Sequence, residues 1–323
     1  MSDNIFPIAE VKEQLKQAGT ISILTHLNPD ADTIGTGLGI YNLLKQDKTK
    51  RVEIVNASNM LPKYLDFLPS YTKIKHKMDF KEGLVIACDC GSIDRLGFDL
   101  LNREILNIDH HASNQNYGSI NVVVPEYASA SQVAYRLFSQ LYNIDEAIAT
   151  CFYAALLSDT RYFTTSSVNH EVFEVAKELV DLGVDSAKVA SYFTQRRSLS
   201  SVRILERALG HLELREEGKI AILFVTRDDM LSTGASMPDM EGIVDYARSL
   251  ATVEIGVFAM EQEENIRISL RSKSVDVSKV SLAFGGGGHK VAAGFILKQT
   301  TLHESIDTIL KKITELGLLH GKS

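Results

Sequence analysis

The sequence predicts a two-domain α/β protein, with a parallel sheet in the N-terminal domain and a smaller α/β domain after it. The length of 323 residues is more than one domain usually needs. Short apolar, β-branched runs alternate with helical patterns through about the first 180 residues, and a similar pattern restarts at residue 211. We therefore expect domains over residues 1–185 and 211–323, with a helical connector over residues 186–210.

Each strand of the first domain is predicted from a short, apolar run that is rich in β-branched residues. These runs are residues 21–25, 51–56, 84–89 and 104–109. Helical patterns cover residues 34–46, 130–142, 146–157 and 171–182. Gly35, Gly37 and Gly39 lie early in the first of these helices and would let it pack close to the sheet. They do not match the G-x-G-x-x-G spacing of a dinucleotide-binding loop, so we discount that class of site.

The second domain follows a single helical segment over residues 186–210, whose four arginines indicate a solvated face. The strands predicted after it are residues 219–226, 252–260 and 265–271. The predicted helices lie near residues 239–250, 276–283 and 302–316. The same region contains the run Gly285–Gly288, followed by His289 and Lys290. A glycine run alone is more often a flexible turn than a binding loop.

Composition excludes several classes of partner. The formal net charge is −7, so the chain lacks the basic field that holds long nucleic acid, although a small anionic substrate is open if metal ions supply positive charge. Three cysteines without a C-x-x-C pair predict a reducing, cytoplasmic environment. Neither a signal-peptide pattern nor an apolar run of about 18 residues is present, so we expect no secretion and no membrane span.

Carboxylate and imidazole side chains stand at the ends of three predicted strands and one helix. They are His26, Asp30, Asp32, Asp89, His110, His111 and Asp159. In open α/β folds, ligands bind at the carboxyl ends of the parallel strands, so we expect these side chains to converge. A single Asp at a strand end is often only a helix N-cap, but coincidence explains four acidic ends poorly.

Hard oxygen and borderline nitrogen ligands of this kind suit Mn²⁺ or Mg²⁺, with Fe²⁺, Co²⁺ or Zn²⁺ as alternatives. Seven candidate ligands are too many for one ion that must also bind a substrate. Two ions that share a bridging carboxylate would use them economically. Two metals about 3.5–4 Å apart can hold the attacking and departing oxygens of a phosphoryl transfer. The residues therefore predict a two-metal hydrolytic centre.

The order H-x-N-P-D-x-D, a strand-borne Asp, D-H-H and a later Asp resembles the DHH phosphoesterase superfamily. The downstream R-S-K and G-G-G-G-H-K-x-A-A-G segments resemble its associated DHHA1 domain. The chain is most similar to the bacterial nanoRNase and pAp-phosphatase branch. Those enzymes hydrolyse very short oligoribonucleotides and often 3′-phosphoadenosine 5′-phosphate (pAp), and some act on pApA, the linear product of cyclic di-AMP breakdown. The resemblance implies an active site in the cleft between the domains, and a homodimer is common in such proteins.

The resemblance also implies roles by motif position. A first metal ion would be held by His26, Asp30 and Asp89, and a second by Asp32, Asp89, His110 and Asp159. Mn²⁺ is the expected ion, with Mg²⁺, Co²⁺ or Fe²⁺ as alternatives, and a hydroxide bridging the two ions would be the nucleophile. His111 would contact the phosphate or donate a proton to the leaving oxygen, and Asp109 would orient a histidine. Substrate phosphate would be bound by Arg271, Ser272, Gly286, Gly287, Gly288 and His289.

One departure and two alternative functions stay open at this point. Arg161 stands where the family usually has Gly after Asp-Thr, which leaves the geometry of that turn undecided. A manganese-dependent inorganic pyrophosphatase shares the first motif, but its accessory domain binds phosphate through a different pattern of lysine and arginine. A nucleotide-binding regulator with a weak or inactive site is the non-enzymatic alternative, and the complete set of ligands argues against it. Long duplex nucleic acid and membranes are not expected partners.

Overall fold

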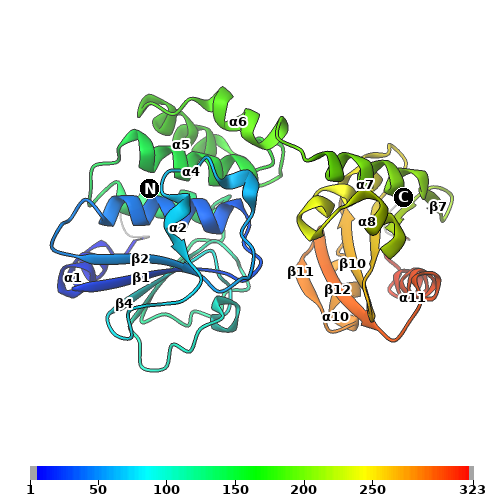
Figure 1. The fold of residues 1–323 in the computed structure, drawn as a ribbon, viewed down its shortest axis with the longest axis horizontal. Helices are drawn as coiled ribbons and strands as arrows, with labels where there is room; N and C mark the ends of the chain where they lie inside the picture. The colour runs from blue at the N-terminus through cyan, green and yellow to red at the C-terminus, as the bar shows by residue number, and fades with distance from the viewer. Residues whose placement is uncertain (1–5, 320–323) are drawn as a thin grey trace. The chain divides into compact units, whose positions relative to one another are not determined.

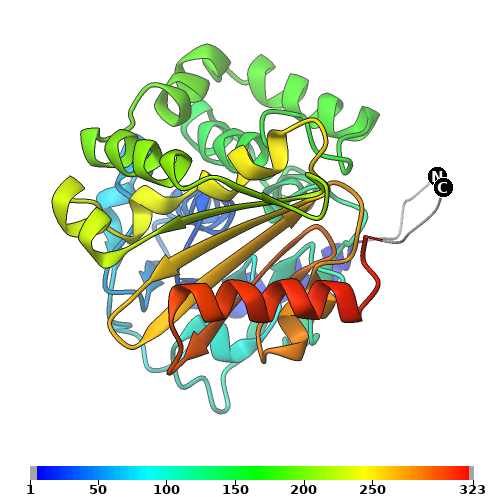
Figure 2. The same ribbon diagram turned by 90° about the vertical axis from the view of Figure 1, so that its right-hand side faces the viewer.

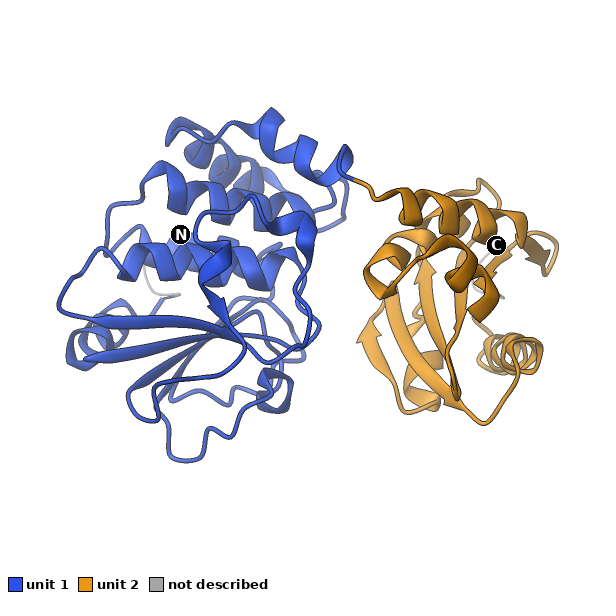
Figure 3. Ribbon diagram, in the orientation of Figure 1, with its two compact units in different colours: residues 1–196 blue, residues 197–323 orange. Residues whose placement is uncertain are grey.

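The computed structural model describes residues 6–319. The chain forms two compact units, residues 1–196 and residues 197–323 (Figure 3). The segment 186–210 is divided between them, because α6 (Ser186–Thr194) lies in the first unit and α7 (Leu199–Gly210) in the second. The expectation of a single helix there is wrong: Ser198 accepts a hydrogen bond from the amide of Ser201 and caps a new helix. No helix within residues 6–319 combines the length and apolar character needed to cross a membrane.

The first unit is built on a six-stranded sheet in which neighbouring strands are parallel. In spatial order, its strands are β3 (Ile74–Lys75), β2 (Arg51–Asn56), β1 (Thr20–Thr25), β4 (Leu84–Cys88), β5 (Ile105–Asp109) and β6 (Ile120–Val123). The four predicted strands are confirmed to within one residue at each end, and the edge strands β3 and β6 were not predicted. After β1, the chain adds β2 and β3 on one side of the sheet, and after β4 it adds β5 and β6 on the other side. The neighbours β1 and β4 therefore form the switch point at which open α/β folds bind ligands.

Helices cover the sheet of the first unit, and Figure 1 shows α2, α4 and α5 in successive layers on one face. Besides α6, its helices are α1 (Ile8–Gln17), α2 (Ala31–Leu44), α3 (Ala130–Phe138), α4 (Glu146–Asp159) and α5 (His170–Asp181), with short 3₁₀ turns η1 (Lys63–Leu65), η2 (Tyr71–Lys73) and η3 (Ile93–Leu96). The prediction that three glycines face the sheet holds only for Gly37, where a Cβ would lie 2.8 Å from Thr25. A Cβ at Gly35 or Gly39 would instead meet α4, so these two glycines let the helices approach closely.

The second unit has a mixed sheet in which only β8 and β9 pair in parallel. In spatial order, the strands are β11 (Gly287–His289), β12 (Ala292–Lys298), β10 (Asn265–Ser272), β9 (Ile255–Glu261), β8 (Ile220–Val225) and β7 (Glu213–Arg215). One face is covered by α7, α8 (Arg227–Thr233), the turn η4 (Met237–Met240) and α9 (Ile243–Ser249), and the other by α10 (Ser278–Ala283) and α11 (Leu302–Glu315). Figure 2 shows α11 lying across this second face.

The glycine-rich segment of the second unit forms the edge hairpin of β11 and β12, which was not predicted. The antiparallel register pairs Ala292 with Arg271 on one side and with His289 on the other. Directly paired residues of an antiparallel sheet point to the same face. Arg271 and His289 therefore lie on one face of the sheet, with Ala292 between them.

Candidate metal centre

The loops after β1, β4 and β5 bring the predicted metal ligands of the first unit together. His26 follows β1, Asp89 follows β4 and His110 follows β5, while the start of α2 and the end of α4 add further carboxylates. Three groups have ligand atoms within 4.8 Å of one another: His26, Asp30 and Asp89; Asp32, His110 and Asp159; and Asp89, Asp109, His110 and His111. Each residue predicted as a metal ligand belongs to at least one group.

Asp89 is central because its two carboxylate oxygens face different histidines. Oδ2 is 3.5 Å from Nε2 of His26, and Oδ1 is 3.6 Å from Nε2 of His110. Oδ1 is buried and accepts no hydrogen bond from the described residues. The backbone φ of Asp89 is 55°, a conformation that Asp and Asn adopt more readily than most residues with a side chain. A buried, orphaned oxygen beside imidazoles fits a bridging metal ligand, because a cation would supply the missing partner.

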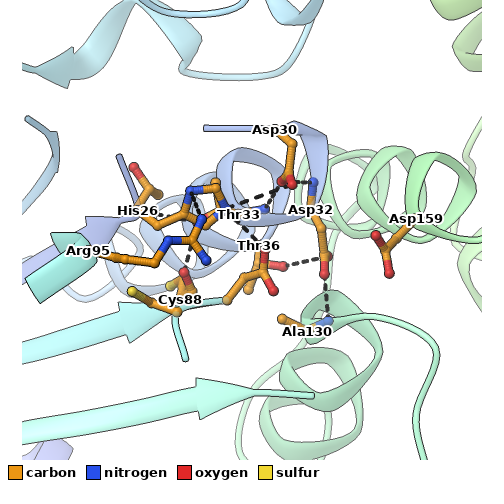
Figure 4. A network of polar contacts seen from close by, with 12 residues as sticks. His26, Asp30, Asp32, Thr33, Thr36, Cys88, Arg95, Ala130 and Asp159 are labelled. Atoms are coloured by element: carbon orange, nitrogen blue, oxygen red, sulfur yellow. Dashed lines mark hydrogen bonds and ion pairs between the residues drawn. The ribbon is translucent and has the colours of Figure 1, made fainter. Parts of the chain in front are cut away.

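His26 and Asp30 form one side of this centre (Figure 4). Nδ1 of His26 lies 2.9 Å from the carbonyl oxygen of Leu27, so a hydrogen on Nδ1 leaves the lone pair of Nε2 facing Asp30. One oxygen of Asp30 caps α2 by accepting from the amides of Asp32 and Thr33, and the other is 3.7 Å from Nε2 of His26. The N-cap and ligand interpretations of this Asp are therefore compatible. The cap also explains why α2 begins three residues earlier than predicted.

His110, Asp32 and Asp159 form the other side. Nε2 of His110 is 3.8 Å from Asp32 and 3.7 Å from Asp159. One oxygen of Asp32 accepts from the amide of Ala130 at 2.7 Å (Figure 4), and the other accepts from the amide of Ser131 at 3.1 Å. These amides belong to the first turn of α3, and the positive end of a helix favours a carboxylate. Helix α3 therefore holds both oxygens of Asp32 in place, including Oδ2, the oxygen that lies nearest His110.

The centre concentrates negative charge in a buried place, and this shifts the pKa values of its groups. Burial, with the charge of Asp89 added, raises the pKa of Asp32 to about 7. Burial and the charges of Asp32 and Asp89 raise the pKa of Asp159 well above its usual range. Burial alone would lower the pKa of His26, but the hydrogen bonds and charges of Asp30 and Asp89 raise it to about 10. Without a cation, the cluster therefore retains protons near neutral pH.

His111 has different contacts from His110. It is held by a network of hydrogen-bonded side chains that the sequence predicts only in part. Nδ1 of His111 lies 2.7 Å from Oδ1 of Asp109, which is the orienting contact expected of Asp109. The other oxygen of Asp109 accepts from the side-chain amide of Asn114, which the sequence analysis missed. Asn114 in turn accepts from Asn107 at 2.9 Å. Asn107 could have indicated this network from the sequence, because an amide side chain inside an apolar strand needs a buried hydrogen-bond partner.

The turn after Asp159 explains why glycine is usual at the position of Arg161. Arg161, Tyr162 and Phe163 all have positive φ, between 46° and 63°. Glycine adopts this conformation freely, whereas other residues lose about 1–2 kcal/mol each. The amide of Arg161 donates to the carbonyl of Ser158 and closes the turn. The chain thus keeps the backbone conformation that glycine favours despite the substitution.

The predicted substrate residues of the second unit have unequal surroundings. Arg271 has a side chain that is 25% exposed, and its Nη1 donates to the carbonyl of Leu270 at 3.0 Å. Gly287–Gly288 and His289 are exposed on the edge strand β11. Arg271 lies two strands in from this edge, on β10, and its Nε is 4.0 Å from Oδ1 of Asp245. The role of these groups in substrate binding stays a prediction.

Ser272 and Gly286 are committed to internal hydrogen bonds. Ser272 is fully buried, and its hydroxyl donates to the carbonyl of Val275. The amide of Gly286 donates to the carbonyl of Ser281 at 2.9 Å. Neither group can bind a phosphate without breaking its present bond.

Asp89→Asn should reduce bound metal more than Asp159→Asn, because Asp89 belongs to two of the ligand groups and Asp159 to one. Asn is a better substitution than Ala here, since it tolerates the φ of 55°. Elemental analysis after gel filtration of the Mn²⁺-loaded variants measures this. Asp181→Asn on the surface of α5 is the control and should keep wild-type metal content. Equal metal content in Asp89→Asn and Asp159→Asn would contradict the central place of Asp89.

Stabilisation by Mn²⁺ should increase with pH. In the metal-free protein, the pKa of Asp32 is raised to about 7 and that of His26 to about 10. Protons bound to these two groups therefore stabilise the metal-free fold, and this stabilisation is lost as the pH rises through the two pKa values. A metal ion must displace the same protons, and therefore binds more tightly at higher pH. The difference in Tm between Mn²⁺-loaded and EDTA-treated protein should be larger at pH 8 than at pH 6. An equal or smaller difference at pH 8 would show that the ion does not replace these protons.

Comparison with known proteins identifies both units. A model of the DHH family, N-terminal domain, matches residues 20–156, and a model of the DHHA1 domain matches residues 203–316. The bifunctional oligoribonuclease and PAP phosphatase NrnA of Thermus thermophilus is 29% identical over 312 residues, which cover 95% of this chain and 93% of that protein. The Bacillus subtilis protein of the same name is 23% identical over 281 residues, which cover 85% and 88%. The crystal structure of an exopolyphosphatase-related protein from Bacteroides fragilis has a TM-score of 0.88 at 25% identity, with 96% of both chains covered.

The matches agree with the placement of the motifs. The first model spans His26, Asp89 and the Asp109–His111 motif, and the second spans Arg271 and the glycine run. The two matches follow each other in the order that the motifs predicted and together cover most of the chain. The chain therefore belongs to the DHH phosphoesterase superfamily and carries its DHHA1 domain.

Proposed function

We propose that this protein is a metal-dependent phosphoesterase that hydrolyses short oligoribonucleotides and pAp, with pApA among its substrates. The observation that carries the proposal is Asp89, whose oxygens face His26 on one side and His110 on the other. This is the arrangement that a hydrolytic centre with a shared carboxylate requires. Relatives named as oligoribonuclease and PAP phosphatase, aligned along most of the chain, support the substrate class.

Two divalent ions, with Mn²⁺ as the expected ion, would complete the centre. When bound, such ions polarise a phosphoryl oxygen and lower the pKa of a water nucleophile. The contribution of the chain is to hold the ligands at fixed positions: the Leu27 carbonyl orients His26, and the amides of α3 hold Asp32. The first ion would be held by His26, Asp30 and Asp89. The second would be held by Asp32, His110 and Asp159, with Asp89 added through its oxygen 3.6 Å from His110.

His111 is the residue that would act on the leaving oxygen. Asp109 holds Nδ1 of His111, so Nε2 is the nitrogen that would donate a proton or a hydrogen bond to the substrate. Burial alone would lower the pKa of His111, but the hydrogen bond to Asp109 and the charge of Asp89 raise it. A histidine oriented by a carboxylate in this way is suited to general acid catalysis, which typically contributes about 10²–10⁴-fold.

Local groups, and not an overall basic field, would select the substrate. The net charge of −7 disfavours long duplex nucleic acid. Arg271, the amides of Gly287–Gly288 and His289 would bind a terminal phosphate of the nucleotide. A homodimer is also part of the proposal. So is a cytoplasmic location, which three free and buried cysteines support.

The Mn²⁺-loaded protein should hydrolyse pAp, pApA and RNAs of two to five nucleotides, and should leave pyrophosphate and long duplex RNA intact. Chromatography of the products and release of inorganic phosphate measure this, with EDTA-treated protein as the control. Turnover of pyrophosphate alone would identify a pyrophosphatase instead. Full metal content without turnover of any of these compounds would identify a nucleotide-binding regulator.

Arg271→Ala should raise KM for pAp and dinucleotides by about 10- to 100-fold, since a lost charge-assisted hydrogen bond is worth roughly 1.5–3 kcal/mol. Metal content should stay unchanged, and hydrolysis of bis-p-nitrophenyl phosphate should change far less, because that compound needs only the metal centre. Arg267→Ala, which removes the same charge four residues away on β10, is the matched control. Equal losses on the nucleotides and on the generic diester, or no loss on either, would contradict an anchoring role for Arg271.

A further inference from the structure

Arg95 lies beside the metal centre, although no motif points to it. It belongs to the turn η3, and the amide of Leu27 donates to its backbone carbonyl at 2.7 Å, which ties this turn to the loop after β1. Its side chain is exposed, and Nη2 lies 3.3 Å from Nδ1 of His26 (Figure 4). Within residues 6–319, its guanidinium forms no ion pair with a carboxylate. Among the described residues, the side chain of this exposed arginine thus has one hydrogen-bond contact, with the proposed metal ligand His26.

The contact between Arg95 and His26 competes with another hydrogen bond. Nδ1 of His26 also lies 2.9 Å from the carbonyl oxygen of Leu27. A carbonyl only accepts, so Nδ1 must carry the hydrogen in that bond, whereas a guanidinium only donates and needs Nδ1 to be bare. The two bonds therefore exclude each other. A His26 that offers the lone pair of Nε2 to a metal ion carries its hydrogen on Nδ1, which selects the bond to Leu27 and releases Arg95.

The released guanidinium lies outside the ligand cluster. Nε2 of His26 faces Asp30 at 3.7 Å and Asp89 at 3.5 Å, whereas Arg95 approaches Nδ1, the other ring nitrogen. A guanidinium on the Nδ1 side of His26 is better placed to bind a neighbouring part of the substrate than to bind the phosphoryl group that reacts at the metal ions. Guanidinium binds two phosphate oxygens at once and stays charged at all relevant pH values.

We propose that Arg95 binds a non-reacting phosphate of the nucleotide on the His26 side of the metal centre, and so selects substrates that carry a phosphate besides the one that is cleaved. This inference rests on the proposed function and narrows its substrate class. It also assigns a phosphate-binding arginine to the first unit, in addition to Arg271 of the second.

The test compares pApA with ApA, which differ by one 5′-phosphate. Arg95→Gln should raise KM for pApA by about 10- to 100-fold and change KM for ApA by less than about 3-fold, with unchanged metal content. Calorimetry gives a readout besides turnover: 5′-AMP should bind the variant about 10- to 100-fold more weakly than the wild type, while adenosine should bind both alike. Arg51→Gln is the matched control, because it removes the same charge from an exposed residue at the amino end of β2.

The possible failures are distinguishable. Equal losses on pApA and ApA, or a loss of metal from Arg95→Gln, would overturn the inference and give Arg95 a role in holding His26. Unchanged binding of 5′-AMP would also overturn it. A wild-type protein that binds Mn²⁺ but cleaves neither dinucleotide would refute the proposed function, and the comparison of 5′-AMP with adenosine would still test Arg95.

Discussion

The crowding of carboxylates around two histidines, with Asp32 and Asp89 buried, is the constraint on which the rest of this structure depends. Asp32, Asp89 and Asp159 lie close enough to raise the pKa values of Asp32 and Asp159, and burial strengthens that effect. The first turn of α3 offsets part of the repulsion at Asp32, and protons or cations must offset the remainder. The fold therefore maintains a group of side chains that is unfavourable by itself, and a ligand that neutralises it also stabilises the fold.

The two units divide the chemistry by charge. In the first unit, the parallel neighbours β1 and β4 end side by side, which brings His26 and Asp89 together across 63 residues of sequence and presents carboxylates to cations. In the second unit, the antiparallel register of β10, β12 and β11 brings Arg271 and His289 to one face, where they would present donors to anions. In the proposed function, metal ions and the phosphates of a nucleotide would thus have separate binding groups, each produced by a different kind of sheet.

The central strands of the first unit were predictable because each is an apolar run that ends at a polar ligand. Strands of two to four residues, such as β3, β6 and β11, were not predicted, because they are too short to show the alternation of apolar and polar residues that indicates a strand. Ser272 appeared to be a site residue, yet alternate positions along β10 are buried, and that alternation places Ser272 in the core. Asn114 and Arg95 were missed because their contacts, with Asp109 and His26, join segments that only the folded chain brings together.

Because Asp89 faces both ligand groups, filling one group cannot leave the other unchanged. A first cation would neutralise Asp89 and fix its carboxylate for the second, but it would also add a positive charge next to the second position. Thermodynamic linkage makes the net effect reciprocal: each ion changes the affinity for the other by the same factor. The protein would therefore respond to metal supply through one coupled isotherm, with either positive or negative cooperativity, and not as the sum of two independent sites.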